Sequence, residues 1–207
     1  MKNSISFLLI LVCLYSCSSR KTKKYSNFNK EQVALILKDV EDRPMRVYKI
    51  TNKTDSILLR TKSNYVKPDS TDVVLQRLVK RMYATVRDSL SLGVGIAAPQ
   101  VGVLRNIILV QRFDKEDLPF EVYLNPQIIN YSEEKQIYRE GCLSIPNRSE
   151  TLDSRSKTVI IEYDTMKEEH KIDTISDFTA VIFQHEIDHL NGILYLDHLN
   201  QEVRDAQ

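Results

Sequence analysis

Apolar residues recur at helical spacing near both ends of the chain. Asn29 can form a capping box with Gln32, which predicts a short helix after it. The apolar positions of this helix are Val33, Ile36, Leu37 and Val40. A last helix is predicted over residues 176–191, with Gly192 placed to end it.

A longer helix is predicted between these two, starting at Asp72. Ser70 or Thr71 is expected to cap it, and Gly93 is expected to close it. One face of this helix is apolar and consists of Leu75, Leu78, Val79, Met82 and Val86. We therefore expect it to pack along the core.

Short runs rich in β-branched residues predict four strands, separated by turn residues. The runs cover residues 106–111, 121–125, 157–163 and 170–175. The strands are bracketed by helices but do not alternate regularly with them. This order predicts a compact α+β domain rather than a βαβ sheet.

The first residues differ in character from the rest of the chain. Residues 5–14 form an apolar run after a single lysine, and Leu14, Tyr15, Ser16 and Cys17 then resemble a bacterial lipobox. We expect residues 1–16 to be a signal peptide, Cys17 to be lipidated, and residues 17–28 to be a polar tether. The domain would then span residues 29–207, anchored by lipid at the cell envelope. The alternative is an apolar N-terminus on a cytoplasmic protein.

Composition removes several classes of function. The chain carries 29 basic and 28 acidic side chains, so it offers no broad basic surface for nucleic acid. Its longest apolar run is shorter than the roughly 20 residues of a membrane-spanning helix. Its three cysteines, at positions 13, 17 and 142, cannot build a disulfide framework. Membrane association is thus expected only through the lipid anchor, and Cys142 is the one thiol of the predicted domain.

The last predicted helix carries a pattern typical of metal sites. His185 and His189 are four residues apart, so both imidazoles project from one face and can reach one ion. Glu186 lies beside this pair, where a base for water activation belongs. A catalytic site usually has a third protein ligand. Cys142 is the best candidate, and its neighbour Gly141 permits close backbone approach. Taken alone, Cys142 would more often be an inert buried thiol, so the assignment depends on its combination with the two histidines.

A metallopeptidase of the His-Glu-x-x-His type is an alternative. The extended pattern of one protease clan places a third histidine where this chain has Tyr195. Such an enzyme would need a displaced ligand such as His198, and it would leave Cys142 without a role.

A segment rich in small residues, 93–102, precedes the predicted strands. It lacks the later glycine of a dinucleotide-binding motif and the lysine of a P-loop, so nucleotide binding is not indicated. It favours a strand edge along which a peptide can lie, with the Gln100 amide directed at a carbonyl oxygen. The alternative is a tightly packed core strand.

Three segments together resemble the peptide deformylase family. They are Gly-Val-Gly-Ile-Ala-Ala-Pro-Gln at 93–100, Glu-Gly-Cys-Leu-Ser at 140–144 and Gln-His-Glu-Ile-Asp-His at 184–189. The likeness extends over about residues 55–196 and implies short antiparallel strands around a central metal-binding helix. It departs at Thr54, where the family has proline. It also departs at 147–155, a segment about one residue longer than usual, which leaves open whether Arg148 or Arg155 fills the expected arginine positions.

The resemblance also implies roles for individual residues. Cys142, His185 and His189 would hold one ion per chain, typically Fe²⁺, with Zn²⁺ or another divalent metal possible. Glu186 would be the general base and acid, and Gln100 with the backbone amide of Leu143 would stabilise the oxyanion. Residues in contact with the substrate would be Gly95, Gly141, Val94, Tyr138, Phe178, Val181 and Ile182.

The implied activity is hydrolysis of the N-formyl group of N-formylmethionyl peptides, with release of formate. Phe178, Val181 and Ile182 share the His185 face of the last helix and can wall a pocket for a methionine-like side chain, although core packing would explain them equally well. The expected partners are formyl-Met peptides or nascent and released polypeptides, and the chain is expected to be a monomer. A non-catalytic envelope protein that binds formyl peptides is a further alternative.

Overall fold

The computed structural model describes residues 27–89 and 93–205. The predicted signal peptide, the lipidation site Cys17 and most of the tether lie outside these residues. Asn27 and Phe28, the end of the predicted tether, pack on the domain: the Asn27 side chain donates to the Lys67 carbonyl oxygen, and Phe28 is buried. No helix in the described part of the chain is long and apolar enough to span a membrane.

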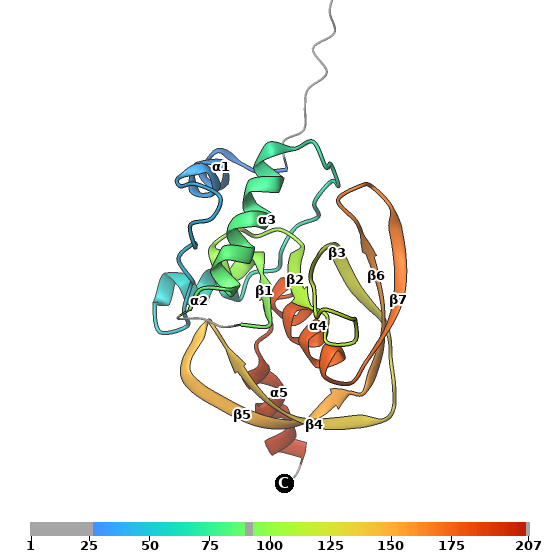
Figure 1. The fold of residues 1–207 in the computed structure, drawn as a ribbon. Coiled ribbons are helices and arrows are strands. Elements are labelled where there is room, and N and C mark those ends of the chain that lie inside the picture. The colour runs from blue at the N-terminus through green and yellow to red at the C-terminus, as the bar shows by residue number, and fades with distance from the viewer. Residues whose placement is uncertain (1–26, 90–92, 206–207) are drawn as a thin grey trace, which may run out of the picture.

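The architecture is α+β, as predicted, with two antiparallel sheets (Figure 1). Its helices are α1 (Lys30–Leu37), α2 (Lys53–Leu59), α3 (Val73–Val86), α4 (Asp177–Leu190) and α5 (Tyr195–Asp205), with a 3-10 turn η1 (Ala98–Val101). Its strands are β1 (Gly95–Ala97), β2 (Ile107–Gln111), β3 (Phe120–Tyr131), β4 (Lys135–Cys142), β5 (Ile145–Ser156), β6 (Thr158–Asp164) and β7 (His170–Ser176).

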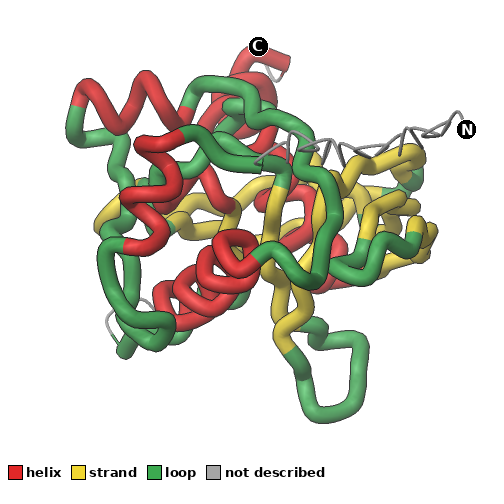
Figure 2. The backbone as a smooth tube through the Cα atoms, turned by 90° about the horizontal axis from the view of Figure 1, so that it is seen from above, coloured by secondary structure: helices red, strands yellow, loops and turns green. Residues whose placement is uncertain are grey.

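The larger sheet has the order β1-β2-β3-β6-β7, and β4 pairs with β5 in a separate hairpin. Helix α4 lies at the centre of the view in Figure 1, and it contacts strands of both sheets. From above, most helical turns lie to the left and most strands to the right (Figure 2). This arrangement places the metal-site motif of α4 where the two sheets approach each other.

Side-chain caps determine where helices α1 and α3 begin. The predicted capping box of α1 is confirmed, since Asn29 Oδ1 accepts from the Gln32 amide at 2.8 Å and Gln32 Oε1 accepts from the Asn29 amide at 3.2 Å. The prediction for α3 is wrong at both ends. Asp72 itself is the cap, accepting from Val74 and Leu75, and the helix ends at Val86. A carboxylate at this position satisfies two amides at once, which leaves no need for Ser70 or Thr71.

The core contains the predicted helix face. Leu75, Leu78, Met82 and Val86 are fully buried, whereas Val79 is only partly buried. Val40, predicted on the apolar face of the first helix, lies beyond its end and is exposed. The helix predicted as the last is followed by α5, which packs on β5.

Candidate metal centre

Two distant segments of the chain bring three potential ligands together. Helix α4 supplies His185 and His189, one turn apart, and the end of β4 supplies Cys142. One ligand atom of each lies within 4.8 Å of the others. Cys142 Sγ is 3.2 Å from His189 Nε2. The predicted ligand residues are thus brought together.

Their chemistry fits a divalent transition metal. A thiolate and two imidazoles are the donors that zinc and iron prefer, and they leave room for water or substrate. Burial opposes ionisation of Cys142, but the two imidazoles outweigh it and hold the thiol pKa well below its usual value. Thiolate is the form in which a cysteine binds a metal ion.

A buried chain of charges orients the first histidine. His185 Nδ1 lies 2.7 Å from Glu140 Oε2, and Arg155 binds both oxygens of that carboxylate at 2.7 and 3.0 Å. Arg155 also donates to Asp188 at 2.7 Å. Burial raises the pKa of Glu140, yet the bonds from His185 and Arg155 prevail and bring it to about 2. With Nδ1 occupied, Nε2 of His185 is the nitrogen left for an ion.

Glu186 occupies the place expected of a proton carrier. It is 4% exposed, lines the central cavity, and its Oε2 has no hydrogen-bond partner in the described part of the chain. Burial raises the pKa of Glu186 to about 7. A buried carboxylate oxygen without a protein partner fits a site that takes up water or an ion.

Gln100 points its amide at the same centre. Its Oε1 accepts from the Ala97 amide at 2.8 Å, which fixes the orientation of the side chain. Its Nε2 then lies 3.5 Å from Cys142 Sγ and 3.4 Å from Ser144 Oγ. Leu143, between these two residues, lines the cavity. A donor is thus held next to the ligand sulfur.

The centre opens into a cavity of about 940 Å³. All the residues predicted to contact substrate line it: Val94, Gly95, Tyr138, Gly141, Phe178, Val181 and Ile182. A Cβ on Gly95 would lie 2.5 Å from Glu186 Oε1, so this position must be glycine. Gly141 has room for a Cβ, since its nearest neighbour would be 3.7 Å away.

The two arginines left open by the sequence have different places. Arg155 is 3% exposed and belongs to the charge chain of Glu140 and Asp188. Arg148 lines the cavity and pairs with Glu150. The bonds among His185, Glu140, Arg155 and Asp188 have no signature in the sequence except Glu140 of the Glu-Gly-Cys segment, which could have indicated a partner for a ligand histidine.

His198, the displaced ligand that a metallopeptidase would need, is not near the ligand atoms. It lies on α5, and its Nε2 contacts Asp188 Oδ2 at 2.8 Å. Tyr195 stacks near His185, and its hydroxyl donates to the Arg148 carbonyl oxygen. The third donor of the group is therefore Cys142.

The chain is similar to known peptide deformylases in sequence. The family model described as polypeptide deformylase matches residues 47–205. A peptide deformylase of Pseudothermotoga lettingae is 38% identical over 161 residues, which cover 77% of this chain and 87% of the relative. One of Finegoldia magna is 38% identical over 140 residues, covering 68% and 82% of the two chains.

Solved structures give the same result. A class I type b peptide deformylase of Acinetobacter baumannii, bound to Met-Ala-Ser, matches with a TM-score of 0.66 and 32% identity, covering 76% of this chain and 99% of that one. A peptide deformylase of Thermotoga maritima matches with a TM-score of 0.66 and 29% identity, covering 75% and 97%.

Proposed function

Because the chain belongs to the polypeptide deformylase family, we propose that Cys142, His185, His189 and Glu186 form the site at which it removes the formyl group from peptides. One observation carries this assignment. Three ligand atoms within 4.8 Å of one another lie beside the unpartnered, buried Oε2 of Glu186, at a cavity of about 940 Å³. This is the composition of a site that hydrolyses an amide with the help of a metal.

Cys142, His185 and His189 would hold one divalent ion. Bound there, the ion supplies Lewis acidity for water and for the carbonyl oxygen of the formyl group. We propose Fe²⁺ as the physiological ion, with Zn²⁺ or another divalent metal as the alternative, because the family resemblance implies it. The Glu140 and Arg155 bonds keep the His185 ring in the orientation that binding requires.

Glu186 is assigned the proton transfers. Its Oε2 has no competing partner, and its Oε1 is held against Gly95, so the carboxylate can accept a proton from the attacking water. The same carboxyl group then delivers that proton to the departing nitrogen, which leaves as a neutral amine. General acid–base catalysis of this kind contributes about 10²–10⁴-fold to the rate.

Gln100 and the Leu143 amide are assigned to the developing oxyanion. Gln100 Nε2 can donate because its Oε1 is already held by the Ala97 amide. A preformed donor needs no reorganisation during the reaction, and losing one costs about 3 kcal/mol.

The proposed substrates are N-formyl-Met peptides, as nascent or released polypeptides. Gly95 and Gly141 lie along the cavity, where a peptide backbone can approach, and Val94, Tyr138, Phe178, Val181 and Ile182 wall a pocket for the first side chain. The Met-Ala-Ser complex of the Acinetobacter baumannii relative supports this choice. A formyl carbon carries only hydrogen, so a narrow site can admit it and exclude larger acyl groups.

The N-terminal motif leads to a proposal about location. Lipidation at Cys17 would anchor a monomeric enzyme to the cell envelope, where it would meet released formyl peptides. The alternative is a cytoplasmic enzyme that acts on nascent chains.

Formate release tests the proposed activity. The full chain, purified without oxygen, is mixed with formyl-Met-Ala-Ser, and formate and free amine are measured together. We expect equal amounts of both, loss of activity after dialysis against a chelator, and recovery with one equivalent of Fe²⁺ per chain. Cleavage of an internal peptide bond would favour the metallopeptidase, and saturable binding without formate would favour the non-catalytic protein. Either result would overturn the proposal.

A further inference from the structure

Three aromatic rings from three different elements meet at the edge of the cavity. Phe178 comes from the first turn of α4, Tyr138 from β4, and Phe113 from the connection between β2 and β3. Tyr138 stacks on Phe178 with ring centroids 4.7 Å apart and planes 10° apart. Phe113 meets Phe178 at 4.9 Å with a tilt of 53°. Phe178 is thus held by two rings.

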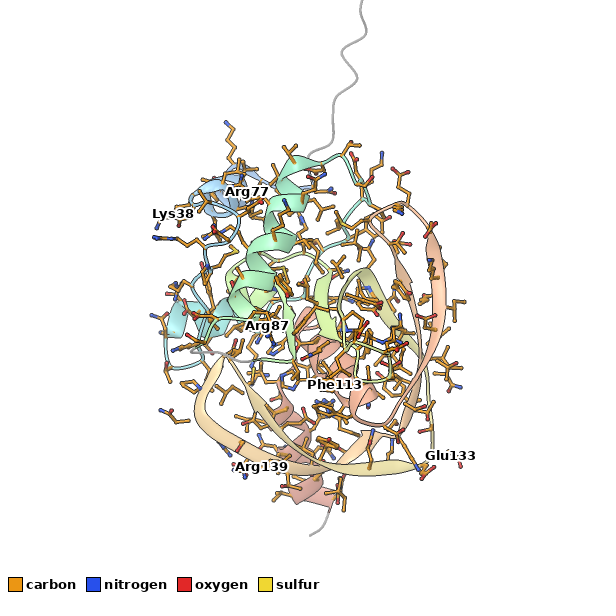
Figure 3. All side chains as sticks on the ribbon, in the orientation of Figure 1. Lys38, Arg77, Arg87, Phe113, Glu133 and Arg139 are labelled. Carbon is orange, nitrogen blue, oxygen red and sulfur yellow. The ribbon has the colours of Figure 1, made fainter. Side chains whose placement is uncertain are left out.

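Only two of these rings reach the cavity. Tyr138 and Phe178 line it, whereas Phe113 is not among its lining residues. Phe113 lies next to α4 in Figure 3, and its exposed fraction is 37%. Any influence of Phe113 on a ligand must therefore pass through the position of Phe178.

The residues on both sides of Phe113 are anchored. Arg112 is 4% exposed and donates to both oxygens of Asp114, at 2.8 and 2.6 Å, and to the Tyr123 hydroxyl at 2.7 Å. Hydrogen bonds from Arg112 and, more weakly, from Thr179 lower the pKa of Asp114. Thr179 follows Phe178 on α4, so Asp114 places the connection next to the helix that carries Phe178.

We propose that Phe113 is a positioning residue that sets the width of the pocket for the first side chain of the substrate, by holding the Phe178 ring against Tyr138. This inference rests on the proposed function. An unbranched thioether side chain fits beside a fixed aromatic wall and gains sulfur–aromatic contacts. A broad planar side chain needs Phe178 to move away, and Phe113 opposes that movement.

Two matched substrates test the inference. A formyl-Met tripeptide and a formyl-Phe tripeptide, identical after the first residue, are compared in wild type and in Phe113→Ala. We expect the formyl-Met over formyl-Phe ratio of kcat/KM to fall about fivefold, the size of one lost ring contact. The change should lie in KM, with a higher value for formyl-Met and a lower one for formyl-Phe, because the reacting groups are untouched.

Two further variants distinguish a positioning role of the Phe113 ring from a general disturbance of the connection between β2 and β3. Phe113→Tyr keeps the ring and should keep the wild-type ratio. Leu118→Ala removes another exposed apolar side chain from the same connection and should also leave the ratio unchanged. An unchanged ratio in active Phe113→Ala, or equal losses for both substrates through kcat, would overturn the inference. If wild type releases no formate from formyl-Met, the proposed function itself has failed, which is a different result.

Discussion

Gly95 packs so closely on Glu186 that any side chain at this position would displace the Glu186 carboxylate. An added Cβ at Gly95 would lie 2.5 Å from Glu186 Oε1 and 2.8 Å from Ile182 Cγ2. A contact of 2.5 Å cannot persist, and the carboxylate would have to turn away from the ligand atoms. The glycine in this strand thus sets the direction of the proposed proton carrier.

Gly95→Ala should therefore lose activity with little loss of metal. Displacing a reacting group by about 1 Å can reduce the rate about 100-fold. The measurement is kcat for a formyl-Met peptide, together with metal content per chain. Gly141→Ala is the matched control, because its Cβ would have room, so this variant should keep kcat and raise KM only. Equal kcat in wild type and Gly95→Ala would show that the contact does not direct Glu186.

The residues that touch the proposed ion could be predicted, and the residues that support them could not. His185, Glu186 and His189 lie within one turn of α4, so the helical spacing of a short motif is enough to predict that they lie together. Glu140 and Arg155 act through long-range packing, since the arginine reaches across paired strands to a carboxylate 15 residues away in sequence. Such a contact has no local periodicity that a single sequence displays.

At the scale of elements, the strands rich in β-branched residues were predicted and the β4–β5 hairpin was missed. Strand β6 alternates buried and half-buried residues, whereas β4 is largely exposed and shows no apolar period. Strand β3 extends beyond its predicted end at residue 125. Asn125 has a φ of 51° and precedes Pro126, which is typical of a strand end, yet a register shift there lets pairing with β6 continue.

Residues 46–49 are bound to the first turn of α2 by hydrogen bonds to Asp55. Asp55, in the first turn of α2, is 4% exposed and accepts from Arg46 at 2.7 and 2.9 Å and from the Lys49 amide at 3.0 Å. The hydrogen bond from Arg46 is the main reason why the pKa of Asp55 is lowered. Arg46 and Lys49 both line the cavity. The Asp55 carboxylate therefore fixes part of the cavity wall by binding these two residues.

The stability that Asp55 contributes should depend on pH. A carboxyl group whose pKa is lowered by folding stabilises the fold above its unfolded pKa, about 4, and ceases to do so as the pH falls through its folded value. Asp55→Asn should therefore melt below wild type at pH 7, and the difference should shrink below about pH 4. Thermal unfolding from pH 7 to 3 measures this. Asp153→Asn, at an exposed position on β5, should show no such difference. If the difference in melting temperature between Asp55→Asn and wild type persists at pH 3, Asp55 stabilises the fold through packing and not through its charge.

At the scale of the whole molecule, the proposed lipid anchor at Cys17 lies apart from the region that matches the family model. Basic and acidic side chains number 29 and 28, and no described helix can span a membrane. Residues 47–205 match the family model, so the N-terminal residues lie outside the matched region. A separate role for the N-terminus is consistent with this division.

Cys17→Ser in the full chain should abolish acylation and move the protein out of the membrane fraction, or leave its precursor uncleaved. Mass spectrometry of the mature N-terminus and fractionation of the cells measure both effects. Cys13→Ser is the control, because Cys13 would be removed with the signal peptide. A wild-type chain that keeps Met1 and stays in the cytoplasmic fraction would exclude the anchor.

The central claim is that Cys142, His185 and His189 hold the ion while Glu186 moves protons. Metal content and formate release, measured on the same preparation of Glu186→Gln, test it most directly. We predict one ion per chain, as in wild type, with formate release reduced about 1,000-fold, because only the proton carrier is removed. Loss of the ion from Glu186→Gln would show that Glu186 is a metal ligand. Retained formate release would show that another residue transfers the protons. Either result would contradict the account.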